Sequence, residues 1–255
     1  MIRTQQSDGV TNIVLDRPER RNALSYEMIR GLGEALDRAA ADTSCRCVVI
    51  RSAGDHFCAG RELAEGADRS LGPVLAYDEA YTAIFRTLIE LDKPSVAVVR
   101  GYAVAGGFTL AMACDFVLAD ESARFGALEM KNGFPAAVNL ALLAKLAPPR
   151  VAIEWLLFGD LVPARRLYEH GLINRLAADS QELEQVQQAF LSAAASLDAE
   201  GVRLGKEAFR VASSSPLRDA LSYGKTLNAL LLASGKIEEG AKAFASRRQR
   251  ARSKT

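Results

Sequence analysis

Apolar residues fall into two alternating patterns along the first half of the chain. Short runs rich in β-branched residues predict buried strands. These runs are Val10–Leu15, Cys47–Ser52, Ser95–Val99 and Phe116–Ala119. Between them, apolar residues return every three or four positions from about Ser25, which suits a helix N-cap, and again over Leu75–Leu91. Strands that alternate with amphipathic helices predict an α/β fold.

Helical patterns dominate the second half of the chain. From about Ala137 onward, Leu172–Leu176 is the one segment that reads as a strand, and prolines separate the helical stretches. Residues 196–255 read as wholly helical. We therefore expect a core over residues 1–195 and a separate helical region over residues 196–255, which forms either a small bundle or an oligomer surface.

Two predicted strands end in corners of small residues. Ser95–Val99 leads to Gly101 and then, past Ala105, to Gly106 and Gly107, where an apolar helical pattern starts. Such a corner directs unpaired amide N–H groups, supported by a helix dipole, toward an anion or a developing oxyanion. The second corner, at 58–60, follows Cys47–Ser52. Glycine pairs also serve close backbone packing alone, and this alternative stays open here.

The composition is typical of a globular protein, with 49% hydrophobic and 25% charged residues. No stretch is apolar for long enough to span a bilayer, and the N-terminus lacks the charged-then-apolar pattern of a signal peptide. We therefore expect a cytoplasmic protein without a membrane partner.

The formal net charge of +1 gives no global field for nucleic acid, so we expect no nucleic-acid partner. Basic residues instead crowd the C-terminus. They are Arg247, Arg248, Arg250, Arg252 and Lys254. Such a tail is either a solvated, frayed end or a contact for phosphate.

Cysteines and histidines give little support for a metal site. The four cysteines show neither metal-ligand spacing nor a disulfide framework, so we expect reduced thiols in the core. With only His56 and His170 available, we expect no metal. A nucleophilic pair of Cys58 with His56 is the remaining alternative.

Six segments of the chain together resemble the crotonase, or enoyl-CoA hydratase/isomerase, superfamily along nearly its full length. They are RPERRNALS (17–25), HFCAGREL (56–63), DKPSVAVVRGYAVAGG (92–107), CDFVLADESARFGALE (114–129), GFPAA (133–137) and EGAKAFASRR (239–248). The resemblance implies an α/β spiral of repeated β-β-α units, followed by a helical C-terminal region that builds trimers, often paired into hexamers. It also implies acyl-CoA thioester substrates and no permanently bound cofactor.

The resemblance assigns chemistry to the two corners. The backbone N–H groups of Arg61 and Gly106 stand where the family holds the thioester carbonyl of an acyl-CoA and stabilises the enolate formed from it. One such donor is worth about 3 kcal/mol. Because the donor is a backbone N–H, any side chain is tolerated at this position, including that of Arg61. For the Arg61 guanidinium we expect either a position in solvent or at a phosphate, or else a pair with Glu65 or a helix cap.

Coenzyme A, as part of the substrate, needs local positive charge from this near-neutral chain. The resemblance places CoA along the loop after the first predicted strand (residues 16–24, the arginine-containing loop). It also places CoA along the basic tail, which in the family reaches CoA bound to a neighbouring subunit. The implied contacts are Arg17, Arg20, Arg21, Ala23, Ala59, Phe244 and Arg247.

The proton chemistry departs from the hydratase pattern. Family hydratases activate water with two glutamates, and the corresponding residues here are Thr109 and Glu129. Because threonine is not a carboxylate base, Glu129 is left as the single base. The family's isomerases keep this glutamate, and one base beside an oxyanion hole is enough to move a double bond. An apolar surrounding would raise its pKa as that role requires.

Three functions therefore follow for the chain. The first is an enoyl-CoA isomerase with Glu129 as its single base. The second is a hydratase in which Glu62, Glu65 or a water held by Thr109 replaces the missing carboxylate, and the third is a non-catalytic acyl-CoA binding protein. A dienoyl isomerase would carry an aspartate in place of Ala137, and a naphthoate synthase would lack Glu129, so these two are excluded.

Overall fold

The computed structural model describes residues 1–62, 70–238, 240 and 242. They divide into two compact units, Met1–Ala199 and Glu200–Thr255. Among the described residues, no helix combines the length and apolarity needed to cross a bilayer.

The first unit is built on a six-stranded sheet with the order β1-β2-β3-β4-β6-β9. Its strands are β1 (Ile2–Ser7), β2 (Val10–Leu15), β3 (Cys47–Ser52), β4 (Ser95–Val99), β6 (Phe116–Asp120) and β9 (Arg175–Ala177). The β1–β2 pair is a hairpin, and the other neighbours are parallel. Parallel strands need crossover connections, and helices supply them here.

A second, three-stranded sheet has the order β5-β7-β8. Its strands are β5 (Tyr102–Val104), β7 (Arg124–Gly126) and β8 (Val162–Pro163). The chain passes from β4 to β5 and from β6 to β7, while β4 pairs with β6 and β5 pairs with β7. Each repeat thus gives one strand to each sheet, and this is the predicted β-β-α spiral.

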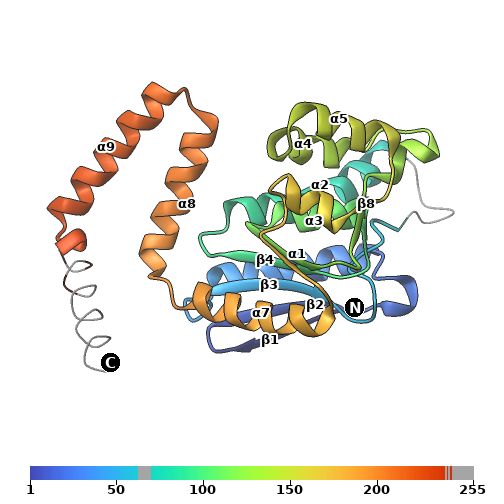
Figure 1. The fold of residues 1–255 in the computed structure, drawn as a ribbon, viewed down its shortest axis with the longest axis horizontal. Helices are drawn as coiled ribbons and strands as arrows, with labels where there is room; N and C mark the ends of the chain where they lie inside the picture. Colours follow the sequence, from blue (N-terminus) through green and yellow to red (C-terminus); the bar gives the residue numbers. More distant parts are fainter. Residues whose placement is uncertain (63–69, 239, 241, 243–255) are drawn as a thin grey trace. The chain divides into compact units, whose positions relative to one another are not determined.

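Helices cover both faces of the large sheet (Figure 1). The helices of the first unit are α1 (Tyr26–Ala41), α2 (Leu71–Glu90), α3 (Gly106–Ala113), α4 (Ala137–Leu146), α5 (Pro149–Phe158), α6 (Ala164–Glu169) and α7 (Ser180–Ala195), with 3-10 turns η1 (Pro18–Arg20) and η2 (Leu128–Asn132). On one face, α7 packs against β3, β6 and β9. On the other, α1, α2 and α3 lie above the sheet.

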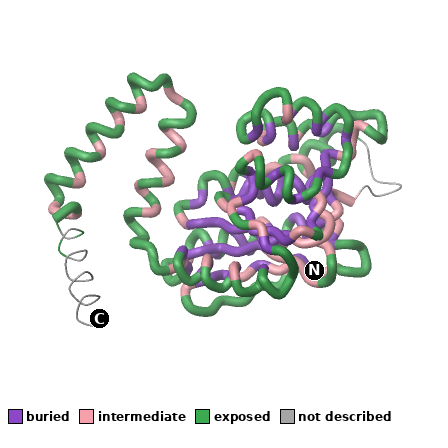
Figure 2. Tube along the Cα trace, in the orientation of Figure 1, coloured by how far each residue is buried: buried purple, intermediate pink, exposed green. Residues whose placement is uncertain are grey.

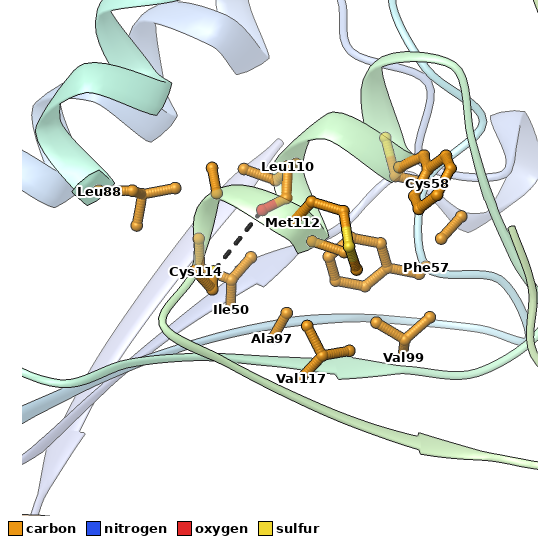
Figure 3. Packing of buried hydrophobic residues seen from close by; sticks show 14 of the residues in the cluster. Ile50, Phe57, Cys58, Leu88, Ala97, Val99, Leu110, Met112, Cys114 and Val117 are labelled. Atoms are coloured by element: carbon orange, nitrogen blue, oxygen red, sulfur yellow. Dashed lines mark hydrogen bonds between the residues drawn. The ribbon is translucent and has the colours of Figure 1, made fainter. Parts of the chain in front are cut away.

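Alternate residues of each central strand enter two different cores, because both faces of the sheet are covered. Val48 and Ile50 point toward α1–α3, whereas Cys47 and Val49 point toward α7. Figure 3 shows the larger core where α3 lies on the sheet, with Leu110 and Met112 packed over Ile50. The buried segments in Figure 2 follow the central strands and this helix. The core holds α3, and with it the corner at Gly106, rigidly in place.

The second unit contains α8, which begins at the boundary (Ala199–Ser214), and α9 (Leu217–Ala233). Neither helix contains a fully buried residue. Within the unit, the Tyr223 hydroxyl bonds the Glu207 carboxylate at 3.1 Å. The helical character predicted for this region is confirmed over its described residues.

The predicted strands agree with the structure, apart from one. Leu172 and Ile173 are buried, but they lie in a turn in which Leu172 N donates to Leu167 O. Asn174 then exchanges hydrogen bonds with the backbone of Val117, and strand pairing starts only at Arg175. The predicted strand over Leu172–Leu176 therefore exists as β9 but starts three residues later, because Leu172 and Ile173 are buried by packing in a turn and not by strand pairing. Helix α2 also starts earlier than predicted, at Leu71.

Candidate active site

The corner between β5 and α3 has an unusual backbone. Ala105 is the N-cap of α3, with φ 49° and ψ −123°, a backbone conformation that residues other than glycine seldom adopt. Its N–H donates to Gly126 O at 2.7 Å, and its carbonyl accepts from Phe108 N and Thr109 N at 3.0 and 3.2 Å. The surrounding hydrogen bonds therefore fix the orientation of the peptide that links Ala105 to Gly106.

The glycines of this corner allow the loop at 58–61 to approach it closely. A Cβ on Gly107 would collide with the carbonyl oxygen of Cys58 and lie 2.7 Å from Cys58 Cβ. One on Gly106 would collide with the Tyr81 hydroxyl and lie 3.3 Å from the amide nitrogen of Arg61. The two predicted corners thus meet in space, and close packing and a donor site require the same glycines.

The amides of Arg61 and Gly106 are neighbours, and within the described part of the chain neither donates a hydrogen bond. The side chain of Arg61 does not take part in this opening. Its guanidinium pairs with Asp78 on α2 and lies 5.0 Å and 5.4 Å from the ring centroids of Tyr77 and Tyr81. The side chain thus anchors the loop to α2.

Glu129 lies in η2 with its carboxyl turned inward. Its Oε2 is buried without a hydrogen-bond partner among the described residues, and its Oε1 accepts from Asn139 Nδ2 at 3.4 Å. Burial raises the pKa of this carboxyl, and the hydrogen bonds from its own backbone and from Asn139 partly oppose the rise. A half-buried carboxylate with one free oxygen is equipped to accept a proton.

Thr109 occupies the position predicted for a second acid, and it is fully engaged. The buried hydroxyl donates to Asn139 Oδ1 at 2.8 Å. The alternative carboxylate, Glu62, is bound to Arg17 by hydrogen bonds of 2.7 and 3.4 Å. These bonds lower the pKa of Glu62, so it is a weaker base than an unpaired glutamate. Glu65 lies outside the described residues.

Tyr81 on α2 completes the polar cluster around the corner. Burial raises the pKa of its phenol, and the hydroxyl interacts with the side chain of Thr109. The hydroxyl lies against Gly106, and the Arg61 guanidinium is 5.4 Å from the ring centroid, so Tyr81 borders the predicted site residues. At physiological pH this phenol is neutral and available as a hydrogen-bond donor.

The arginine-containing loop is fastened to the second corner by Asn22, which is fully buried. Its Oδ1 accepts from Arg17 N at 2.8 Å, and its Nδ2 donates to Ala53 O and His56 O at 2.9 and 2.8 Å. Backbone bonds then run from Ala59 N to Arg21 O and from Leu24 N to Gly60 O.

The structure places the remaining predicted CoA contacts as follows. Arg20 and Arg21 are exposed, with the Arg21 guanidinium 6.0 Å from the Tyr102 ring centroid, whereas Ala23 and Ala59 are partly buried. Arg17 is committed to Glu62. The predicted contacts Phe244 and Arg247 lie outside the described residues.

All four cysteines lie buried as thiols, as predicted. Full burial raises the pKa of the Cys58 thiol to about 12, which keeps the sulfur protonated and a poor nucleophile. His56 uses Nδ1 to accept from Tyr102 N at 3.3 Å. The Cys58–His56 pair is therefore disfavoured. The described residues contain no cluster of three or more potential metal ligands.

Sequence reasoning missed three residues of this site: Asn22, Tyr81 and Asn139. Asn139 is a polar residue in the first turn of the otherwise apolar stretch AVNLALL, which was a signal that could have been used. Tyr81 belongs to the apolar pattern of α2, and Asn22 follows two arginines. Neither had a distinguishing signal.

Comparison with known proteins gives consistent results. The sequence profile described as "Enoyl-CoA hydratase/isomerase" matches residues 5–252. A Thermus thermophilus protein named "Putative enoyl-CoA hydratase" is 37% identical over 243 residues, 94% of this chain and 95% of the relative. The 1,2-epoxyphenylacetyl-CoA isomerase of Escherichia coli is 31% identical over 245 residues, covering 94% and 93%.

Solved structures agree on the fold. The crystal structure of human enoyl coenzyme A hydratase domain-containing protein 3 superposes with a TM-score of 0.90 and 26% identity, over 96% of this chain and 97% of that one. The α/β fold predicted from the sequence is thus confirmed. With a matching profile over almost the entire length and full-length relatives of both reaction types, the chain belongs to the enoyl-CoA hydratase/isomerase family, the crotonase-type enzymes that act on CoA thioesters.

Proposed function

We propose that the protein is an enoyl-CoA isomerase in which Glu129 is the single base. The observation that carries this proposal is the contrast between two neighbouring positions. Glu129 has a buried Oε2 without a described partner, whereas the position of a second acid holds Thr109, whose hydroxyl is bound to Asn139. One free base beside two unpaired amides suits proton relocation better than addition of water.

In the proposed reaction, Oε2 of Glu129 removes a proton from C2 of a 3-enoyl-CoA. The electron pair left behind spreads over C2, C4 and the thioester oxygen, which accepts hydrogen bonds from the N–H groups of Arg61 and Gly106. The carboxylic acid of Glu129 then returns the same proton to C4. The double bond ends between C2 and C3, and no atom is gained or lost. The raised pKa of Glu129 helps both transfers.

Hydration of a 2-enoyl-CoA is the second candidate, because several relatives are named as hydratases. It requires a partner for Glu129 that activates or orients water. Glu62 is held by Arg17, and the Thr109 hydroxyl has two acceptors within the protein, Asn139 Oδ1 at 2.8 Å and Ala105 O at 3.4 Å. These contacts support the isomerase over the hydratase.

The test incubates the protein with a 3-enoyl-CoA and, separately, with crotonyl-CoA in ¹⁸O-labelled water, and identifies the products by mass. We expect a 2-enoyl product without label, lost in Glu129→Gln and kept in Glu154→Gln, which changes an exposed glutamate on α5. Labelled 3-hydroxyacyl-CoA would establish the hydratase instead. Binding of CoA thioesters without turnover of either compound would establish a binding protein.

We infer that the CoA portion lies along the arginine-containing loop, with Arg20 and Arg21 facing its phosphates and Ala23 and Ala59 beside the chain that leads to the thioester. The exposure of both arginines supports this placement. Replacing both with alanine should raise KM and leave kcat nearly unchanged. Phe244 and Arg247 stay predicted contacts for CoA on a neighbouring subunit.

We further infer that the helical C-terminal region assembles the chain into trimers or hexamers. Large apolar side chains on α8 and α9 support this inference because they are exposed in the single chain. They include Phe209, Leu217, Leu221 and Leu230. Sedimentation equilibrium would test it, and a monomer at micromolar concentration would contradict it.

A further inference from the structure

Asn139 connects the two halves of the candidate active site. It lies in the first turn of α4, is 2% exposed, and uses its whole amide for hydrogen bonds. Its Nδ2 donates to Ala105 O at 3.0 Å and to Glu129 Oε1 at 3.4 Å, and its Oδ1 accepts from Thr109 Oγ1 at 2.8 Å. One side chain thus links the N-cap and first turn of α3 to Glu129 in η2.

The contact with Ala105 bears directly on the donor at Gly106. The Ala105 carbonyl and the Gly106 N–H are opposite ends of one planar peptide, so fixing the direction of the C=O also fixes the direction of the N–H. Asn139 is the nearest side-chain donor to this carbonyl, which also accepts from two backbone amides of α3 and lies 3.4 Å from the Thr109 hydroxyl. Donors on the oxygen polarise the peptide and strengthen its N–H as a donor.

The contact with Glu129 selects which carboxylate oxygen is free. Because Oε1 accepts from Asn139, Oε2 is the oxygen left without a described partner. The amide orientation follows from chemistry: the neighbours of Nδ2 are a carbonyl and a carboxylate, which are both acceptors, so the reverse orientation would place oxygen against oxygen. Thr109, whose hydroxyl donates to Oδ1, stabilises this orientation.

We propose that Asn139 is a positioning residue that couples the Gly106 donor to the Glu129 base, with Thr109 holding its amide in the required orientation. This inference rests on the proposed function. In the proposed isomerase, Thr109 orients Asn139, whereas the family's hydratases have a catalytic glutamate at this position. Tyr81 on α2, whose hydroxyl lies against Gly106, is a titratable group at the same corner, and its raised pKa keeps it neutral in the working range.

The first experiment compares Asn139→Leu with wild type. Leucine is similar in size but has no donor, so the Glu129 carboxylate and the Ala105 carbonyl each lose the hydrogen bond from Asn139. We expect kcat to fall about tenfold or more, since hydrogen bonds to charged groups are the stronger ones. KM should change little, and the acid limb of the kcat/KM profile should move to higher pH. The control, Asn132→Leu, changes an exposed asparagine on the same 3-10 turn as Glu129.

A second pair of variants keeps the test valid if Asn139→Leu folds poorly. Thr109→Val matches the shape of threonine and removes the hydroxyl, and Thr109→Ser restores a hydroxyl. We expect kcat to fall in the valine variant and to recover in the serine variant. Equal kcat values in the two variants would overturn the role of Thr109, and an unchanged kcat and pH profile in Asn139→Leu would overturn that of Asn139.

A titration that needs no turnover separates this inference from the proposed function. In protein labelled with ¹³C at glutamate carboxyls, the Glu129 resonance is the one absent from Glu129→Gln. Its pKa should be lower in wild type than in Asn139→Leu, because the lost donor stabilised the charged form. If wild type isomerises no 3-enoyl-CoA, the proposed function fails, whereas equal titrations in the two proteins would overturn the coupling of Asn139 to Glu129.

Discussion

The narrow space around Gly106 gives a quantitative prediction for a pair of variants. In Gly106→Ala, the new methyl group collides with the hydroxyl of Tyr81. The Tyr81 ring is buried in the core, so it has little room to move away. Overpacking of this kind costs about 1–3 kcal/mol of folding free energy. In Gly106→Ala/Tyr81→Phe, the hydroxyl is absent, and the nearest atom of residue 81 is ring Cζ, which lies 3.2 Å from the methyl position. A shift of a few tenths of an ångström relieves that contact.

The double variant should therefore be more stable than the sum of the single changes predicts, by about 1 kcal/mol or more. Urea denaturation of wild type, both single variants and the double variant would measure this coupling energy. The same four proteins, assayed for kcat/KM, show whether the corner also regains activity. Additive stability changes would refute the reasoning, because they would mean that the methyl group and the hydroxyl do not meet.

The remaining predictions concern stability and its pH dependence. Gly107→Ala should destabilise the fold by about 3 kcal/mol, since its Cβ collides with the backbone of Cys58. Gly33→Ala should stabilise α1 by up to about 1 kcal/mol, because no atom lies within 4 Å of the new methyl group. Urea titrations would measure both changes, and equal effects would contradict this prediction. Asn22→Ala should cost about 1–3 kcal/mol by leaving three backbone groups without their side-chain partner. Because burial raises the pKa of Glu129, the folded protein binds the proton of this carboxyl more tightly than the unfolded chain does. Ionising the buried carboxyl therefore lowers the stability of the fold, and this loss is complete above the folded-state pKa. Glu129→Gln should thus be more stable than wild type at pH 8, with the difference vanishing below about pH 4; a pH-independent difference would contradict the raised pKa.

Long and short elements differed in how well the sequence predicted them. The central strands were predicted with their ends within one residue, because runs such as 47–50 are buried on both faces and therefore continuously apolar. Strands of two or three residues, such as β5 and β8, carry no such pattern, since they are defined by pairing with distant segments. Strand β1 was missed because its residues are mostly exposed and polar.

The candidate site could be predicted where a local motif or the family resemblance pointed to it. Gly106 and Arg61 lie at small-residue corners, and the structure brings them together. Asn139 could not be linked to the site in this way, because its partners Thr109 and Ala105 are 30 and 34 residues away. Only the packing of α4 against α3 makes them neighbours.

The strained backbone of Ala105 explains why so many groups converge on one peptide. A residue with φ 49° and ψ −123° would relax in isolation, at a gain of about 1–3 kcal/mol. Gly126 O, two amides of α3 and Asn139 all oppose that relaxation. The same peptide carries the Gly106 N–H, and Asn139 also bonds Glu129, so one side chain orients both the proposed donor and the proposed base. In the proposed reaction, this arrangement keeps the group that removes the proton aligned with the group that stabilises the resulting charge, without a second carboxylate.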